Sequence, residues 1–160
     1  MIRARTLVLA VMLSVAAAAP ARADFTAFIG PNFTPANRLT SGLAAGWGLV
    51  IVGFEFEFAS TTDDPPQGAP ALKTGMGNVL LQSPVPIFGA QPYITVGAGL
   101  AREVLGTNED TSIGVNTGGG VKINLTGPLR LRVDYRVFKL GNNFLYSPVH
   151  RVYVGLNLKF

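Results

Sequence analysis

The sequence contains a single histidine, and a serine lies three residues before it. Ser147 and His150 offer a nucleophile and a base close together in the chain, and a serine hydrolase needs such a pair together with an acid that orients the histidine. Proximity in sequence does not supply this geometry, and the chain has no His-x-Ser motif. We therefore predict that the protein is not an enzyme, and we interpret His150 as a polar residue at the start of a C-terminal strand.

Three other motifs could bind ligands, but each has a simpler interpretation. Gly97-x-Gly99 and the Gly118–Gly120 run look like phosphate loops, yet neither opens a helix, so no helix N-terminus faces a phosphate. Asp63 and Asp64 supply too few oxygen ligands for calcium, which takes about 6–8. The chain has no cysteine. We predict no metal site and no cofactor.

In two segments, 52–59 and 129–137, the charged residues all lie on alternate positions and are separated by apolar residues. A period of two is that of a β-strand, whose successive side chains point to opposite faces. If the charged faces meet inside a narrow lumen, opposite charges at one level must pair, because an isolated buried charge is costly. The alternative is that they line a hydrated channel. The predicted ion-pair network comprises Glu55, Glu57, Lys122, Arg130, Arg132, Asp134 and Arg136.

The elements that would position these charges are eight strands. The alternation is cleanest in 52–59, 129–137 and 151–160, and weakest in 74–82, where Val79, Leu80 and Leu81 interrupt it. The even number and the strand lengths suit a membrane-spanning barrel, whose tilted strands need about 9–11 residues. The expected strands are 25–30, 42–48, 52–59, 74–82, 93–100, 113–125, 129–137 and 151–160.

The connections between these strands alternate in character, as an up-and-down barrel requires. Four are polar or rich in Pro, Gly and Asn, and we expect them to be outer loops. The other three are short or stiff, and we expect them to be periplasmic turns. The expected loops are 33–40, 61–72, 106–110 and 141–148, and the expected turns are 48–50, 83–90 and 126–128.

The first 23 residues have the pattern of a secretory signal peptide. Arg3 and Arg5 precede an apolar run that is too short to span a bilayer, and Ala21 and Ala23 supply small residues before a cleavage site. We predict cleavage after Ala23, which leaves residues 24–160 as one domain. The mature chain then has ten basic and nine acidic residues, so nothing in its charge indicates a nucleic-acid partner.

The composition favours a membrane barrel over a soluble barrel. The mean hydropathy is +0.35, yet after the leader no apolar run approaches the roughly 20 residues of a spanning helix. Only 14% of residues are charged, against about 25% in soluble domains. The polar face of the strands is rich in small residues, which suits a tight lumen. We expect an all-β, eight-stranded, antiparallel, up-and-down transmembrane barrel, with Trp47 and Tyr135 in an interfacial aromatic girdle.

The leader, the segment Pro92–Gly99 and the ending His150–Phe160 resemble the opacity-protein and surface-antigen family of small outer-membrane barrels. The resemblance covers most of residues 24–160, although the expected outer loops are shorter than those of host-contacting opacity proteins. It implies the outer membrane of a Gram-negative bacterium as location, and the bilayer and the outer-membrane insertion machinery as partners. It also implies that the C-terminal residues Phe160, Leu158 and Leu156 are the assembly signal.

Three functions remain open at this stage. The first is a structural or surface role for a monomeric barrel whose lumen is closed by the ion-pair network. The second is a porin-like channel for small solutes, which the chain length disfavours because water-filled porins use about 16–18 strands. The third is a lipid A-modifying hydrolase. The three-residue spacing of Ser147 and His150 is weak support for it, because proximity in sequence does not supply catalytic geometry.

Overall fold

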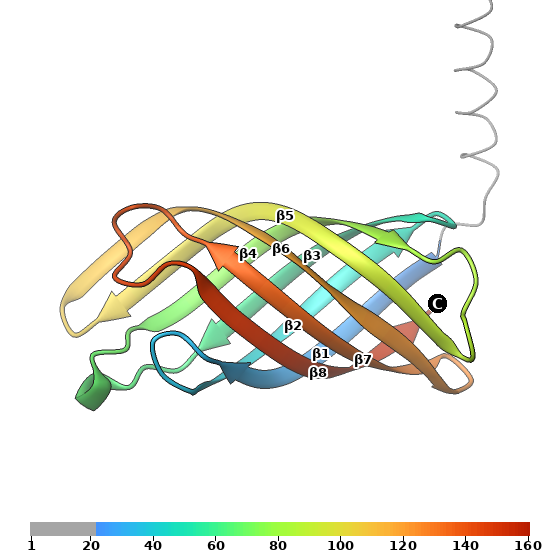
Figure 1. Cartoon of the computed structure of the whole chain (residues 1–160), viewed down its shortest axis with the longest axis horizontal. Helices are drawn as coiled ribbons and strands as arrows, with labels where there is room; N and C mark the ends of the chain where they lie inside the picture. Colours follow the sequence, from blue (N-terminus) through green and yellow to red (C-terminus); the bar gives the residue numbers. More distant parts are fainter. Residues whose placement is uncertain (1–21) are drawn as a thin grey trace, which may run out of the picture.

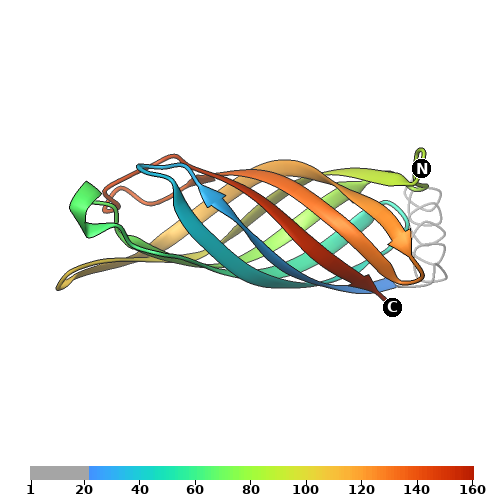
Figure 2. The ribbon, with the colours of Figure 1, turned by 90° about the horizontal axis from the view of Figure 1, so that it is seen from below.

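The computed structural model describes residues 22–160 as a closed barrel of eight antiparallel strands, each paired with its neighbours in sequence. The barrel closes where the first strand pairs with the last. Both chain ends of the barrel lie at one end with the three turns, and the four loops lie at the other (Figures 1 and 2). The strands are β1 Arg22–Asn32, β2 Arg38–Gly48, β3 Val52–Thr61, β4 Ala71–Gln82, β5 Ala90–Leu105, β6 Asn108–Thr126, β7 Leu129–Lys139 and β8 Val149–Lys159.

The fold prediction is thereby confirmed, including its least certain strand. In β4 the side chain of Leu80 points into the barrel and is 2% exposed, while Val79 and Leu81 point outward. The run of three apolar residues therefore still alternates in space. It obscured the pattern in the sequence only because the inward position is apolar here instead of polar.

One loop prediction was wrong. Residues 106–110 do not form a loop, because β5 and β6 continue as a paired hairpin up to the Leu105–Asn108 pair. The tight turn is possible because Gly106 adopts a φ of 62°, which glycine tolerates without steric cost. The alternation was hidden at this end because residues 108–112 of the β6 arm are polar at every position. This hairpin projects farther than the other loops (Figure 1).

The other connections follow the prediction more closely. A short 3-10 helix, η1 (Pro65–Gln67), lies in the loop between β3 and β4. Within residues 22–160, no helix has the length and apolar character needed to cross a membrane.

A glycine fixes one close approach inside the barrel. A Cβ on Gly155 would lie 2.7 Å from the carbonyl oxygen of Ala27 and 2.9 Å from the Cβ of Phe28. The inward face of β8 therefore has no room for a side chain at this position. The small residues of the polar face thus let the barrel close tightly around larger inward side chains.

Most of the predicted signal peptide lies outside the described residues. The described part begins with Arg22 and Ala23, which pair with Gly48 and Trp47 at the start of β1. Cleavage after Ala23 would remove two residue pairs from the strand and leave the rest of β1 in place. Cleavage itself stays a prediction.

Candidate functional site

The barrel is apolar outside and ionic inside. On β3 the outward residues Phe54, Phe56 and Phe58 are 42–67% exposed, whereas the inward Glu55 and Glu57 are at most 3% exposed. A soluble barrel has the opposite arrangement, with charges in water and apolar side chains inside. The functional candidates therefore lie in the lumen, and the outer surface is suited to contact lipid.

The central feature of the lumen is a salt bridge from one wall to the other. Glu55 on β3 accepts hydrogen bonds from Arg132 and Arg136 on β7, which lies opposite β3 in the ring of eight. The Nη2 atoms of Arg132 and Arg136 are 3.2 Å and 2.9 Å from Glu55 Oε1. Both guanidiniums are fully buried. These contacts fix the distance between two strands that share no backbone hydrogen bond.

A second bridge includes a residue that the sequence analysis missed. Arg151 on β8 donates from Nη1 to Glu57 Oε1 at 3.0 Å, and its Nη2 is 3.2 Å from the Thr74 hydroxyl on β4. Arg136 Nη1 lies 2.9 Å from Glu57 Oε2. The alternation of β8 places Arg151 on the inward face, so the residue could have been identified from the same pattern that identified Arg132.

Asp134 neutralises the remaining charge of this layer. Its carboxylate accepts from Arg132 Nη2 at 3.0 Å and from Arg136 Nε at 3.1 Å. The hydroxyls of Tyr93 and Tyr153 also donate to it. We call this set the middle ionic layer. It holds three arginines and three carboxylates, so its formal charge is zero: Glu55, Glu57, Arg132, Asp134, Arg136 and Arg151.

Lys122 and Arg130 belong to a separate cluster nearer the turns. Both donate to Asp24 Oδ2, at 2.6 Å and 3.0 Å, and Arg130 also donates to Asn157. From the sequence, these two cations were expected in the same network as Glu55, and Asp24 was not among its predicted members. We call Asp24, Lys122 and Arg130 the turn-end cluster. A cavity of about 100 Å³ at the turn end is lined by this cluster and by Glu55.

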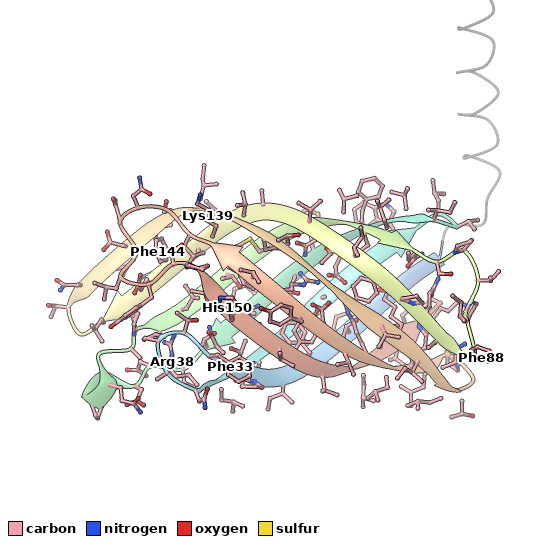
Figure 3. The ribbon with its side chains drawn as sticks, in the orientation of Figure 1. Phe33, Arg38, Phe88, Lys139, Phe144 and His150 are labelled. Carbon is pink, nitrogen blue, oxygen red and sulfur yellow. The ribbon has the colours of Figure 1, made fainter. Side chains whose placement is uncertain are left out.

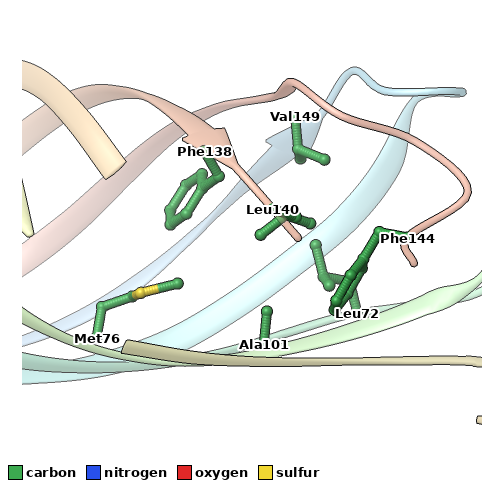
Figure 4. Packing of buried hydrophobic residues seen from close by; sticks show 7 residues of the cluster. All are labelled: Leu72, Met76, Ala101, Phe138, Leu140, Phe144 and Val149. Atoms are coloured by element: carbon green, nitrogen blue, oxygen red, sulfur yellow. The ribbon is translucent and has the colours of Figure 1, made fainter. Parts of the chain in front are cut away.

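The loop end of the lumen is filled by apolar side chains (Figure 4). Seven buried residues from β4, β5, β7, β8 and the loop between β7 and β8 pack together there. We call them the apolar plug. Arg151 joins the plug to the middle ionic layer, because its guanidinium lies 4.3 Å from the centre of the Phe138 ring. The plug comprises Leu72, Met76, Ala101, Phe138, Leu140, Phe144 and Val149.

The loops at this end are held over the plug by polar contacts. Ser147 Oγ accepts from the backbone amide of Leu140 at 3.1 Å, and Glu103 accepts from the amide of Leu145 at 3.2 Å. Arg38 donates to the carbonyl oxygens of Pro70 and Thr34 and so connects two other loops. Figure 3 places Arg38 and Phe144 at this end and Phe88 at the opposite end.

The candidate catalytic pair is not assembled. Ser147 Oγ bonds to the backbone of Leu140, while His150 Nδ1 is 2.8 Å from the Tyr135 hydroxyl on the outside of the barrel. No hydrogen bond joins Ser147 to His150 in the described residues, and no carboxylate bonds to the imidazole there. Asp64 accepts from Gln67 in its own loop. Within residues 22–160, no group of three or more His, Cys, Asp or Glu is arranged to hold a metal.

The residues assigned to the girdle and to assembly lie on the outer surface. Trp47 at the turn end of β2 is half exposed and stacks on Phe54 at 5.9 Å, and Tyr135 is 46% exposed near the loop end of β7. Phe160 is 75% exposed, and its amide donates to the carbonyl of Ala23 at 2.8 Å. Leu156 and Leu158 also face outward. These positions agree with the assigned roles, which stay predictions.

No family model and no curated protein matches the sequence. Among solved structures, the fold is similar to Neisserial surface protein A, with 18% identity, a TM-score of 0.71, and 88% of this chain and 97% of that chain covered. It is also similar to the N-terminal β-barrel domain of Pseudomonas aeruginosa OprF, with 15% identity, a TM-score of 0.67, and coverages of 87% and 97%. The outer membrane enzyme PagL has 12% identity, a TM-score of 0.53, and coverages of 84% and 98%. At these identities the likeness establishes the fold of small outer-membrane barrels and no particular activity.

Proposed function

We propose that this protein is an outer-membrane barrel with a structural or surface role, and that its lumen does not conduct solutes. The observation that carries the proposal is the complete burial of the charges in mid-lumen. Arg132, Arg136 and Arg151 are 0% exposed. Side chains that line a water-filled channel are exposed to that water, so this burial supports a closed lumen and argues against the porin-like alternative.

The membrane placement is supported by the polarity of the two faces. Every strand carries large apolar side chains on its outward face, and in the described residues the outward cations Lys73, Arg102 and Lys139 all lie at the loop end. In lipid every backbone polar group must be paired internally, and a closed barrel satisfies this requirement. We infer that the loop end faces outward from the cell and that the turn end faces the periplasm.

A hydrolase of the PagL kind has less support. PagL shares the fold, but fold alone does not carry an activity. In this chain Ser147 and His150 are bound to different partners on different sides of the barrel wall. A non-enzymatic role is therefore the better proposal.

The test is single-channel conductance of the refolded, full mature chain in a planar bilayer. We expect no sustained conductance steps in wild type. Insertion must be shown on the same sample, by heat-modifiable mobility on gels and by protection of the barrel from protease. An inserted, protease-resistant barrel with steady porin-like steps would contradict the closed lumen and leave the membrane placement intact.

The assembly role of the C-terminus has its own test. Deletion of Phe160 is expected to reduce outer-membrane yield while export across the inner membrane continues. N-terminal sequencing of the same outer-membrane material tests processing, which we propose leaves Asp24 as the first residue. Full yield of the deletion variant would rule out Phe160 as part of the signal.

A further inference from the structure

Two cations lie side by side on the outer surface at the loop end. Lys73 on β4 is the direct cross-strand neighbour of Arg102 on β5, and both side chains are exposed. Like charges directly opposite one another destabilise a sheet. Arg102 is compensated in part by an exposed ion pair with Glu109, whereas Lys73 forms no ion pair within the described residues. The pair therefore carries uncompensated positive charge, which is available to bind an external anion.

The pair stands at the edge of the apolar band. Below Arg102, the outward residues of β5 are Leu100, Ala98, Val96 and Ile94. Below Lys73, the outward residues of β4 begin with Gly75 and Gly77. In the membrane placement proposed above, the two cations lie at the level of the outer-leaflet headgroups.

A groove runs along the surface directly below Lys73. On β4 it is bordered by Gly75 and Gly77, next to their cross-strand neighbours Phe58 and Phe56. From there it extends over Leu43 and Ala45 of β2 to Phe25 of β1. The groove has a volume of about 430 Å³. A Cβ added to Gly75 would meet no atom within 4 Å, so the groove is open at this position. Cation pair and groove thus form one continuous surface, polar above and apolar below.

We propose that this surface binds an outer-leaflet lipid, with a phosphate monoester between Lys73 and Arg102 and an acyl chain in the groove beside Phe58. The monoester is favoured because it carries a charge of about −1.5 to −2 near neutral pH, which two cations match better than the single charge of a diester. The phosphorylated glycolipid of the Gram-negative outer leaflet has this chemistry. The proposal rests on the membrane placement under Proposed function.

The experiment measures lipid binding to the refolded full mature chain in zwitterionic detergent by native mass spectrometry. The probes are bisphosphorylated lipid A, dephosphorylated lipid A and phosphatidylglycerol. We expect lipid A to bind at least ten-fold more tightly than either other lipid, and the Lys73→Gln/Arg102→Gln variant to lose at least ten-fold in affinity for it. Higher salt should weaken the binding, because the cations are exposed.

Three single variants sharpen the test. Lys139→Gln removes an outward cation at the same end (Figure 3) but on β7, which lies opposite β3 in the ring of eight, and should change the affinity less than two-fold. Glu109→Gln releases Arg102 from its carboxylate and should strengthen binding two- to three-fold. Gly75→Leu fills the groove without a clash at its Cβ and should weaken binding at least three-fold.

Some results would refute the lipid site alone. Others would refute the membrane placement on which the site depends. Equal affinities of wild type and the double variant, or equal affinities for phosphorylated and dephosphorylated lipid A, would refute the site. Phosphatidylglycerol binding as tightly as lipid A would refute the assignment to a monoester. Heat-modifiable mobility and protease protection in vesicles are measured on the same proteins. A wild type that fails to insert refutes the membrane placement and the lipid site together, whereas normal insertion with unchanged affinities refutes the lipid site alone.

Discussion

The middle ionic layer and the apolar plug fill the same lumen through different interactions. In the ionic layer each charge is acceptable only because opposite charges surround it, as Arg132 and Arg136 surround Glu55. In the plug, side chains such as Phe138 and Leu140 contribute through the water they exclude and the volume they fill. The ionic layer should therefore respond to loss of a partner, and the plug to loss of volume.

This difference has a structural consequence. Salt bridges of defined geometry connect opposite walls, from β3 to β7 and from β3 to β8, so the ionic layer specifies which strands face each other. The plug is formed partly by the loop between β7 and β8, through Leu140 and Phe144. We infer that the ionic layer holds the barrel cross-section and that the plug closes its mouth.

The largest effect is expected from breaking the ionic layer at its centre. Glu55→Ala leaves two buried guanidiniums without one of the two carboxylates that they share, and should destabilise the barrel by about 3–5 kcal/mol. The measurement is denaturant unfolding in lipid vesicles, followed by the fluorescence of Trp47. The control is Glu109→Gln, which removes an exposed ion pair and should cost less than about 1 kcal/mol. Equal midpoints for Glu55→Ala and wild type would show that the cross-lumen bridges do not stabilise the fold.

In the plug, Phe138→Ala is expected to cost about 3 kcal/mol, because it leaves a cavity in place of a fully buried ring. It also removes the ring that lies against the Arg151 guanidinium. Phe138→Leu keeps most of the volume and should cost clearly less, which separates a volume effect from loss of the ring contact. If both substitutions cost the same, contact with Arg151 is the dominant contribution of Phe138.

The outer face offers a third environment for comparison. Val154 on β8 points outward and is 45% exposed, so Val154→Arg would place a charge against lipid and should cost about 2–3 kcal/mol in vesicles. Val154→Leu is the matched control and should be near neutral. If Val154→Arg left the free energy of unfolding unchanged in vesicles with a thick bilayer, the assignment of this face to lipid would be contradicted.

The smallest effect is expected where two polar partners are replaced together. The hydroxyls of Thr40 and Thr61 lie 2.8 Å apart and both side chains are buried. Thr61→Val alone leaves the other hydroxyl unpaired and should cost about 1–2 kcal/mol, whereas Thr40→Val/Thr61→Val should stay within about 1 kcal/mol of wild type. A double-mutant cycle measures the coupling. If the double variant were destabilised by more than the sum of the two single variants, this account of the pair would be contradicted.

The alternation of side chains along the chain was enough to predict the strands, their two faces and the closed barrel. The reason is that β-structure has a side-chain period of two, so residues such as Phe56 and Glu57 must face opposite ways once the strand forms. The inward position of Arg151 was also contained in the pattern of β8, although the sequence analysis did not assign it to the network. The projecting β5–β6 hairpin was not evident, because residues 108–112 of its β6 arm are all polar and show no alternation.

Which inward charges pair with one another became clear from the folded barrel alone. Pairing across the lumen depends on the register of all eight strands and on the tilt of the strands in the barrel. The side-chain period of two specifies neither the register nor the tilt. Asp24 thus pairs with Lys122 and Arg130 from β6 and β7, and these cations lie apart from Glu55. The apolar plug was likewise decided by tertiary structure, because Leu140 and Phe144 come from a loop that has no period and is positioned by its contacts with the barrel mouth.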